Sequence, residues 1–190
     1  MFLDIAFGIL VAILWDTAGF SPLTWWSLAV AICFALLPDI DGVVSAIARI
    51  GRGNDLTDQF SHEHREIFHH PIPYLVFGSA VLAVATLSPV LVIMFATLSL
   101  LHFAHDSIGI GWGLRWGSPW SQIAYKWFCD QDGNFAWRRI ARWTPNEQHT
   151  VAEKRGDPDW FKNIYLRPSV VSAVETIGFI AALILLWMYW

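Results

Sequence analysis

The sequence predicts an all-α, multi-pass membrane protein in which about five short apolar helices span the bilayer. Of the 190 residues, 55% are hydrophobic and only 15% are charged, and the mean hydropathy is +0.45. A soluble domain of this length usually has about a quarter charged residues, and one core of this size could not bury so much apolar surface. The 12 Trp residues agree with a membrane location, because Trp concentrates where membrane meets water.

Runs of residues with little or no formal charge mark the expected spans. In chain order these are residues 2–15, 23–37, 71–87, 90–105 and 169–190. The first span contains one acid, Asp4, and the last contains Glu175 near its start. Several spans are shorter than the usual 20 or so residues, which favours local thinning of the bilayer or burial against other helices. A competing four-span arrangement places residues 2–20 on the membrane surface.

The central apolar run, residues 71–105, is predicted to form two spans. It contains no Lys, Arg, Asp or Glu over 35 residues, which is too long for one helix across about 30 Å of hydrocarbon. Ser88-Pro89 interrupts the run near its middle, where proline disfavours continuation of a helix. A helical hairpin is therefore expected here.

The basic residues lie on one side of this arrangement. Five spans place residues 38–70 and 106–168 on the same side, and all 12 Lys and Arg residues fall in these two loops. The opposite connections, around residues 16–22 and 88–89, contain none. The positive-inside rule then predicts that both loops are cytoplasmic. The N-terminus is expected inside and Trp190 outside.

Three regions follow from this topology: a membrane helix core (1–110), a cytoplasmic region rich in aromatic and basic residues (111–168) and a C-terminal transmembrane helix (169–190). Within the cytoplasmic region, residues 135–143 have the sequence FAWRRIARW. Helical spacing would place Trp137 and Ile140 near one face and the arginines elsewhere. This pattern predicts a helix that lies either on anionic lipid or against the membrane domain.

Three polar motifs occur at the expected cytoplasmic ends of the second, third and fourth spans. They are LPDIDG at 37–42, the histidine-rich HREIFHH at 64–70 and HFAHD at 102–106. Each has an ordinary alternative when taken alone. The acids could form a solvated turn, the histidines a solvated loop or a pH sensor, and His102 a neutral side chain that reaches the interface.

Because consecutive spans carry these motifs at the same side, the motifs can converge on one site. The expected metal ligands are Asp39, Asp41, His64, His69, His102 and Asp106. His102 and Asp106 are four residues apart, so a helix presents both to one point. This mixture of nitrogen and oxygen donors suits one or two divalent ions, with zinc preferred over manganese or iron. A metal with an open coordination position would lower the pKa of bound water.

The combined motifs resemble the membrane-bound metal-dependent hydrolase family typified by the LexA-binding inner membrane-associated hydrolase. Its pattern is LPDIDH, then HRGxTHS, then HxxxD at the end of an apolar helix, and the resemblance covers roughly residues 30–120. The resemblance implies metal-dependent hydrolysis and a location in a prokaryotic inner (plasma) membrane. In this chain Gly42 stands where the family has His, Glu66 where it has Gly and His70 where it has Ser. Either His70 or His62 could replace a missing ligand.

The expected activity is hydrolysis of phosphoesters or lipids at the cytoplasmic membrane face. Arg65, beside an expected ligand, could hold a phosphate oxygen, and Asp39 or Asp41 could act as a general base. The expected partners are membrane lipid and a small-molecule or lipid substrate, without nucleic acid. Two alternatives are a divalent-metal transporter and a non-enzymatic membrane scaffold with a structural metal. Ionisable residues at several membrane depths would favour transport, whereas here these residues cluster at one edge of the membrane.

Overall fold

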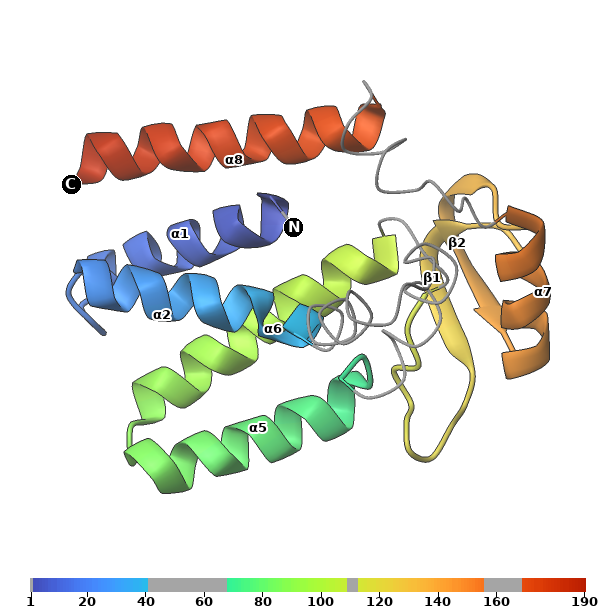
Figure 1. The fold of residues 1–190 in the computed structure, drawn as a ribbon, viewed down its shortest axis with the longest axis horizontal. Helices are drawn as coiled ribbons and strands as arrows, with labels where there is room; N and C mark the ends of the chain where they lie inside the picture. Colours follow the sequence, from blue (N-terminus) through green and yellow to red (C-terminus); the bar gives the residue numbers. More distant parts are fainter. Residues whose placement is uncertain (1, 41–67, 109–112, 156–168) are drawn as a thin grey trace, which may run out of the picture. The chain divides into compact units, whose positions relative to one another are not determined.

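The computed structural model describes residues 2–40, 68–108, 113–155 and 169–190, and these are mostly helical (Figure 1). Helices occupy all five apolar runs: α1 (Phe2–Thr17), α2 (Trp25–Leu36), α5 (Pro71–Thr86), α6 (Pro89–Ile108) and α8 (Val170–Tyr189). The break at Ser88 separates α5 from α6, as the proline predicted. The expected helices are therefore present where the apolar runs predicted them.

Two of these helices, α6 and α8, are long and apolar enough to cross a membrane by length and composition. The shorter α2 and α5 are also apolar. Large apolar side chains are exposed along α8, including Val170, Ile177 and Trp187. Such an exposed apolar surface fits contact with lipid. The number of spans, five or four, stays a prediction.

The chain divides into two compact units. The first consists of Met1–Pro38, Leu75–His102 and Phe161–Trp190, and the second of Asp39–Tyr74 and Phe103–Trp160. Helix α6 is continuous and passes from the first into the second.

In the first unit, α1 packs against both α2 and α8 (Figure 1). Gly8 allows a close approach of α1 to α2, because a Cβ atom at this position would lie 2.8 Å from the Ile32 Cα atom. Met94 and Leu98 of α6 belong to the same buried apolar cluster. Small residues at helix contacts are common in membranes, where close backbone packing contributes much of the attraction between helices.

Glu175 of α8 is a buried acid with an identified partner. It is 2% exposed, and its Oε2 atom accepts a hydrogen bond of 3.0 Å from the backbone N–H of Phe2. Because this N–H is among the first of α1, no intrahelical carbonyl can accept it. The contact satisfies both groups and joins the start of α1 to α8.

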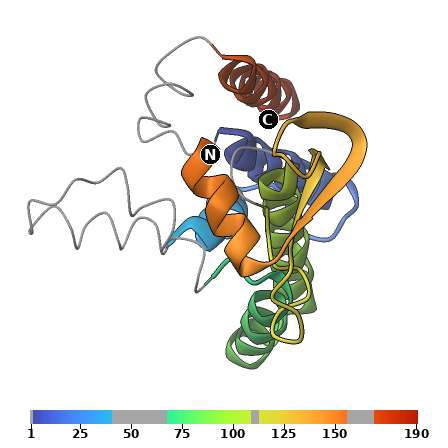
Figure 2. The same cartoon turned by 90° about the vertical axis from the view of Figure 1, so that its right-hand side faces the viewer.

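The second unit contains an antiparallel hairpin of β1 (Ala124–Cys129) and β2 (Phe135–Trp143), followed by α7 (Pro145–Arg155) (Figure 2). The connection between the strands is held by the Asp130 carboxylate, which accepts backbone N–H groups of Asp132 and Asn134. Gly133 adopts a φ of 84°, which a glycine tolerates readily.

The prediction of a helix at residues 135–143 was wrong, and so was the prediction of an exclusively α-helical fold. Near its end β2 alternates with a period of two, since Ala141 and Trp143 are buried while Ile140 and Arg142 are exposed. Pairing with β1 supplies backbone hydrogen bonds, and aromatic and β-branched residues favour strands. The Asp132-Gly133 pair was the available sequence signal for a hairpin.

We predict that a periplasmic reporter fused after Trp190 is active and that a cytoplasmic reporter there is inactive. The reason is that all Lys and Arg residues fall in two loops, which five spans would place on the same side of the membrane. Insertion of the cytoplasmic reporter in the 130–134 turn is the control, and it should be active. Cytoplasmic activity after Trp190 would contradict five spans in this orientation.

Candidate metal centre

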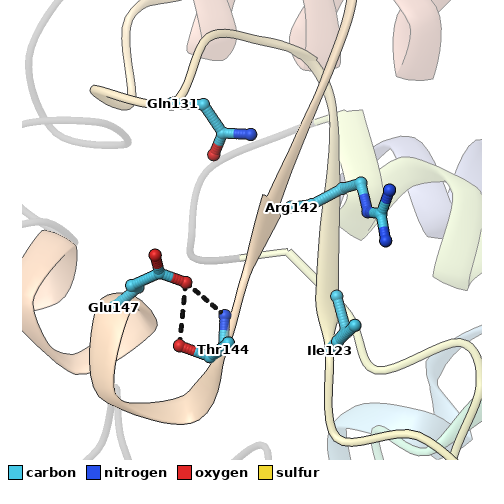
Figure 3. Close-up of a pocket in the computed structure, with 5 residues that line it drawn as sticks. All are labelled: Ile123, Gln131, Arg142, Thr144 and Glu147. Carbon is cyan, nitrogen blue, oxygen red and sulfur yellow. Dashed lines mark hydrogen bonds between the residues drawn. The ribbon is translucent and has the colours of Figure 1, made fainter.

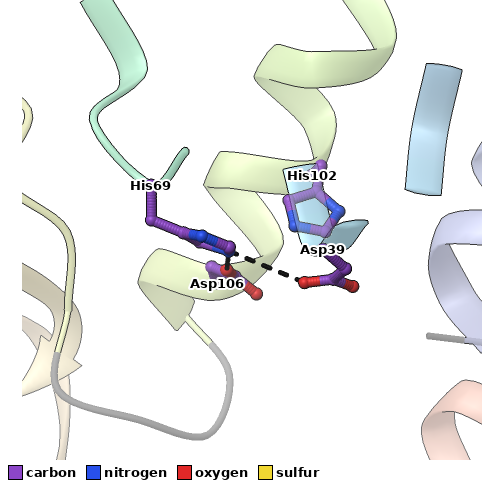
Figure 4. A group of neighbouring side chains, drawn as sticks. All are labelled: Asp39, His69, His102 and Asp106. Carbon is purple, nitrogen blue, oxygen red and sulfur yellow. Dashed lines mark ion pairs between the residues drawn. The ribbon is translucent and has the colours of Figure 1, made fainter. Parts of the chain in front are cut away.

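The last two turns of α6 carry the central pair of the candidate site. His102 and Asp106 lie one turn apart on this helix, as their i, i+4 spacing predicted (Figure 4). His102 is 1% exposed, and the Asp106 side chain is 19% exposed. An apolar helix thus ends in two ionisable groups.

Proline residues place two further members at the ends of other helices. Helix α2 ends at Leu36, and the 3₁₀ turn Leu37–Asp39 that follows contains Pro38 and ends at Asp39. His69 lies two residues before Pro71, the first residue of α5, a position where the missing N–H of proline costs no helical hydrogen bond. Both side chains therefore extend from chain segments that are anchored by a helix.

The four side chains are close enough to hold one ion. His69 Nε2 lies 3.2 Å from Asp106 Oδ2 and 3.6 Å from Asp39 Oδ1. One ligand atom from each of Asp39, His69, His102 and Asp106 lies within 4.8 Å of the other three. Ligand atoms at about 2.0–2.2 Å from a shared zinc ion can be at most about 4.4 Å apart. The donor set therefore fits a divalent cation after small side-chain adjustments.

The site is more accessible on its carboxylate side than on its imidazole side. The His69 and His102 side chains are 0% and 1% exposed, whereas those of Asp39 and Asp106 are 33% and 19% exposed. A catalytic metal needs a coordination position that water or substrate can reach, while a structural site is closed by protein ligands. This difference in exposure would let water or a substrate reach a bound metal from the side of Asp39 and Asp106.

Aromatic side chains flank the site in the second unit. The Phe103 ring packs edge to face against the rings of His69 and Trp116, with centroid distances of 6.2 and 6.4 Å respectively. Trp116 stacks on Trp127 of β1 with ring centroids 5.9 Å apart, and its Nε1–H donates to Ser107 Oγ of α6. These contacts hold the end of α6 against the hairpin and place the apolar ring of Phe103 against His69.

Sequence reasoning missed Asp4 of α1, which lies behind His102. Asp4 is 1% exposed, and its Oδ1 atom lies 3.3 Å from His102 Nδ1. The same Nδ1 atom lies 3.0 Å from the backbone carbonyl oxygen of Ala35. One signal was present in the sequence: Asp4 is an acid within an apolar run, and ionisable residues at membrane depth are usually functional.

The remaining predicted site residues are Asp41, His64 and Arg65, and all three lie outside the described residues. The substituted positions Gly42 and Glu66, and the alternative ligand His62, do as well. Their roles stay predictions. The other alternative ligand, His70, is partly buried and is not in the group of four.

A separate surface pocket lies between the hairpin and the start of α7, and Figure 3 shows its lining. Here the Glu147 carboxylate accepts hydrogen bonds of 2.8 Å from both the backbone N–H and the hydroxyl of Thr144. These two bonds lower the pKa of Glu147. Their position at the first turn of α7 is that of a helix cap. We therefore interpret this pocket as structural.

Comparison with known proteins agrees with the membrane character of the chain. A family model described as YdjM inner membrane protein matches residues 3–190. No curated protein and no solved structure matches the chain.

Proposed function

This chain belongs to the YdjM inner membrane protein family, known as the family of LexA-binding inner membrane-associated candidate hydrolases, and on that premise we propose that it is a membrane-bound metal-dependent hydrolase. The observation that carries the proposal is the group Asp39, His69, His102 and Asp106. Two buried imidazoles and two partly exposed carboxylates form a donor set suited to zinc, with manganese or iron as alternatives.

Each member of the group has a proposed task. His69 and His102 hold the ion from the buried side, since their side chains are 0% and 1% exposed. Asp106 completes the binding set from the end of α6. Asp39 is the most exposed member, so it can reach a water proton and act as the general base where it does not bind the metal. A bound divalent ion supplies Lewis-acid polarisation and water activation.

The proposed substrate class is a phosphoester, either of a lipid or of a small molecule at the cytoplasmic membrane face. Arg65 directly follows the predicted ligand His64. Its guanidinium group can form paired hydrogen bonds to phosphate oxygens, with a geometry that a lysine cannot reproduce. Asp41, two residues after Asp39, is the alternative general base.

The test is metal content together with hydrolysis of a generic phosphodiester by the protein purified in detergent. We expect bound metal and chelator-sensitive turnover in the wild type. Arg65→Ala should retain the metal but lose about tenfold to a hundredfold in turnover, because hydrogen bonds to charged groups contribute about 1.5–3 kcal/mol. Arg139→Ala, at an exposed position of β2, is the matched control and should keep wild-type turnover.

Other outcomes would contradict the proposal. Metal uptake into vesicles without turnover of any ester would favour the transporter. Metal that is needed for stability in detergent, again without turnover, would favour a scaffold. Full turnover after complete removal of metal would exclude metal-dependent chemistry.

A further inference from the structure

Asp4 is a buried acid that the proposed chemistry does not use directly. It lies in the first turn of α1, a helix otherwise free of charge until Asp16. Its exposure is only 1%, although transfer of a carboxylate out of water is costly without a specific partner. The ring of His102 is such a partner, with 3.3 Å between Asp4 Oδ1 and His102 Nδ1.

The surroundings of His102 determine which ring nitrogen carries the proton. The Ala35 carbonyl oxygen, 3.0 Å from Nδ1, can only accept a hydrogen bond, and an ionised Asp4 carboxylate can also only accept. The proton is therefore assigned to Nδ1, on the evidence of the hydrogen-bond network. In a neutral imidazole, Nε2 then keeps its lone pair and is the atom that can bind a metal ion.

We infer that Asp4 is a positioning residue for the metal centre, because it orients His102 and makes its Nε2 atom a stronger ligand. The inference rests on the proposed function and extends the site to α1. Metal-binding histidines commonly donate their second N–H to a carboxylate or a carbonyl, which fixes the ring and raises its basicity. Here both kinds of acceptor meet the same N–H.

The negative charge of Asp4 also distinguishes it from the Ala35 carbonyl. Asp4 and His102 have side-chain exposures of 2% and 1%, so water screens their interaction weakly. A carboxylate in this position favours a partial positive charge on the ring, which develops when Nε2 donates its lone pair to a cation. The carbonyl alone would fix the ring but would supply less of this stabilisation.

The experiment compares the zinc affinities of the wild-type protein and its variants in detergent, measured by competition with a chromophoric chelator. Asp4→Asn removes the charge with little change in shape. We expect its zinc affinity to fall about tenfold to a hundredfold, the usual effect of losing such a partner. Asp4→Glu should recover part of the lost affinity. Asp16→Asn is the matched control, because this second acid of α1 accepts a hydrogen bond from the Tyr189 hydroxyl. The zinc affinity of this variant should equal that of the wild type.

Measurement of the melting temperature of the metal-free proteins separates a positioning role from a purely structural one. A lower melting temperature for Asp4→Asn with wild-type zinc affinity would overturn the inference and leave the metal site intact. Wild-type zinc affinity in both Asp4→Asn and Asp4→Glu would also overturn the inference and leave the metal site intact. A wild-type protein that binds no zinc, manganese or iron would instead overturn the proposed function, and this inference with it.

Discussion

Asp106→Ala should contain no bound divalent metal after purification and should hydrolyse no phosphodiester, while its helices insert and its melting temperature stays near that of the wild type. Asp106 is one of the four proposed ligands, its Oδ2 atom lies 3.2 Å from His69 Nε2, and its side chain is 19% exposed. Alanine lacks only the carboxylate group of aspartate, and His69 Nε2 keeps Asp39 Oδ1 at 3.6 Å as a neighbour, so we expect a small loss of stability. The apolar helices insert without the ion, so fold and activity should separate.

Two further variants make this result specific. Asp132→Ala, at an exposed position of the hairpin turn, is the matched control and should keep metal and turnover. His102→Ala should also lose both, but with lower stability, because it removes a buried partner of Asp4. Metal content, turnover and melting temperature are measured on the same preparations. Full hydrolysis by metal-free Asp106→Ala would end the hydrolase proposal in this form.

Gly8→Ala should lower the melting temperature in detergent and weaken metal binding. The added Cβ atom would lie 2.8 Å from Ile32 Cα and 3.0 Å from Ile32 N, and these backbone atoms cannot move aside without separating α1 from α2. Overpacking of this kind costs about 1–3 kcal/mol. Asp4 of α1 and Ala35 of α2 both contact His102, so a wider spacing should also disturb the metal ligand.

The control for this effect is Gly178→Ala in α8. Its Cβ would lie 3.0 Å from Leu3 Cδ1, the end of a flexible side chain that can rotate away. Alanine also favours a helix over glycine by about 1 kcal/mol, so this variant should be neutral or slightly more stable. Thermal unfolding and zinc competition measure both effects. Equal stability of the two variants would contradict close packing of α1 on α2.

The sequence by itself determined the helices and part of the site. Apolar runs predicted five helices, because a long apolar segment in a membrane must satisfy its backbone hydrogen bonds internally and a helix does so locally. Ser88-Pro89 separated α5 from α6 for an equally local reason. His102 and Asp106 could be paired from their spacing alone, since a helix places residues i and i+4 on one face.

Only the tertiary structure decided the strand at 135–143 and the role of Asp4. Trp137 and Ile140 match a helical period, but partners in β1 supply the hydrogen bonds that favour the extended chain. Asp4 and His102 are 98 residues apart in the chain and meet only because α1, α2 and α6 share one core. No local pattern encodes such a contact, because it depends on how helices pack and not on which residues form them.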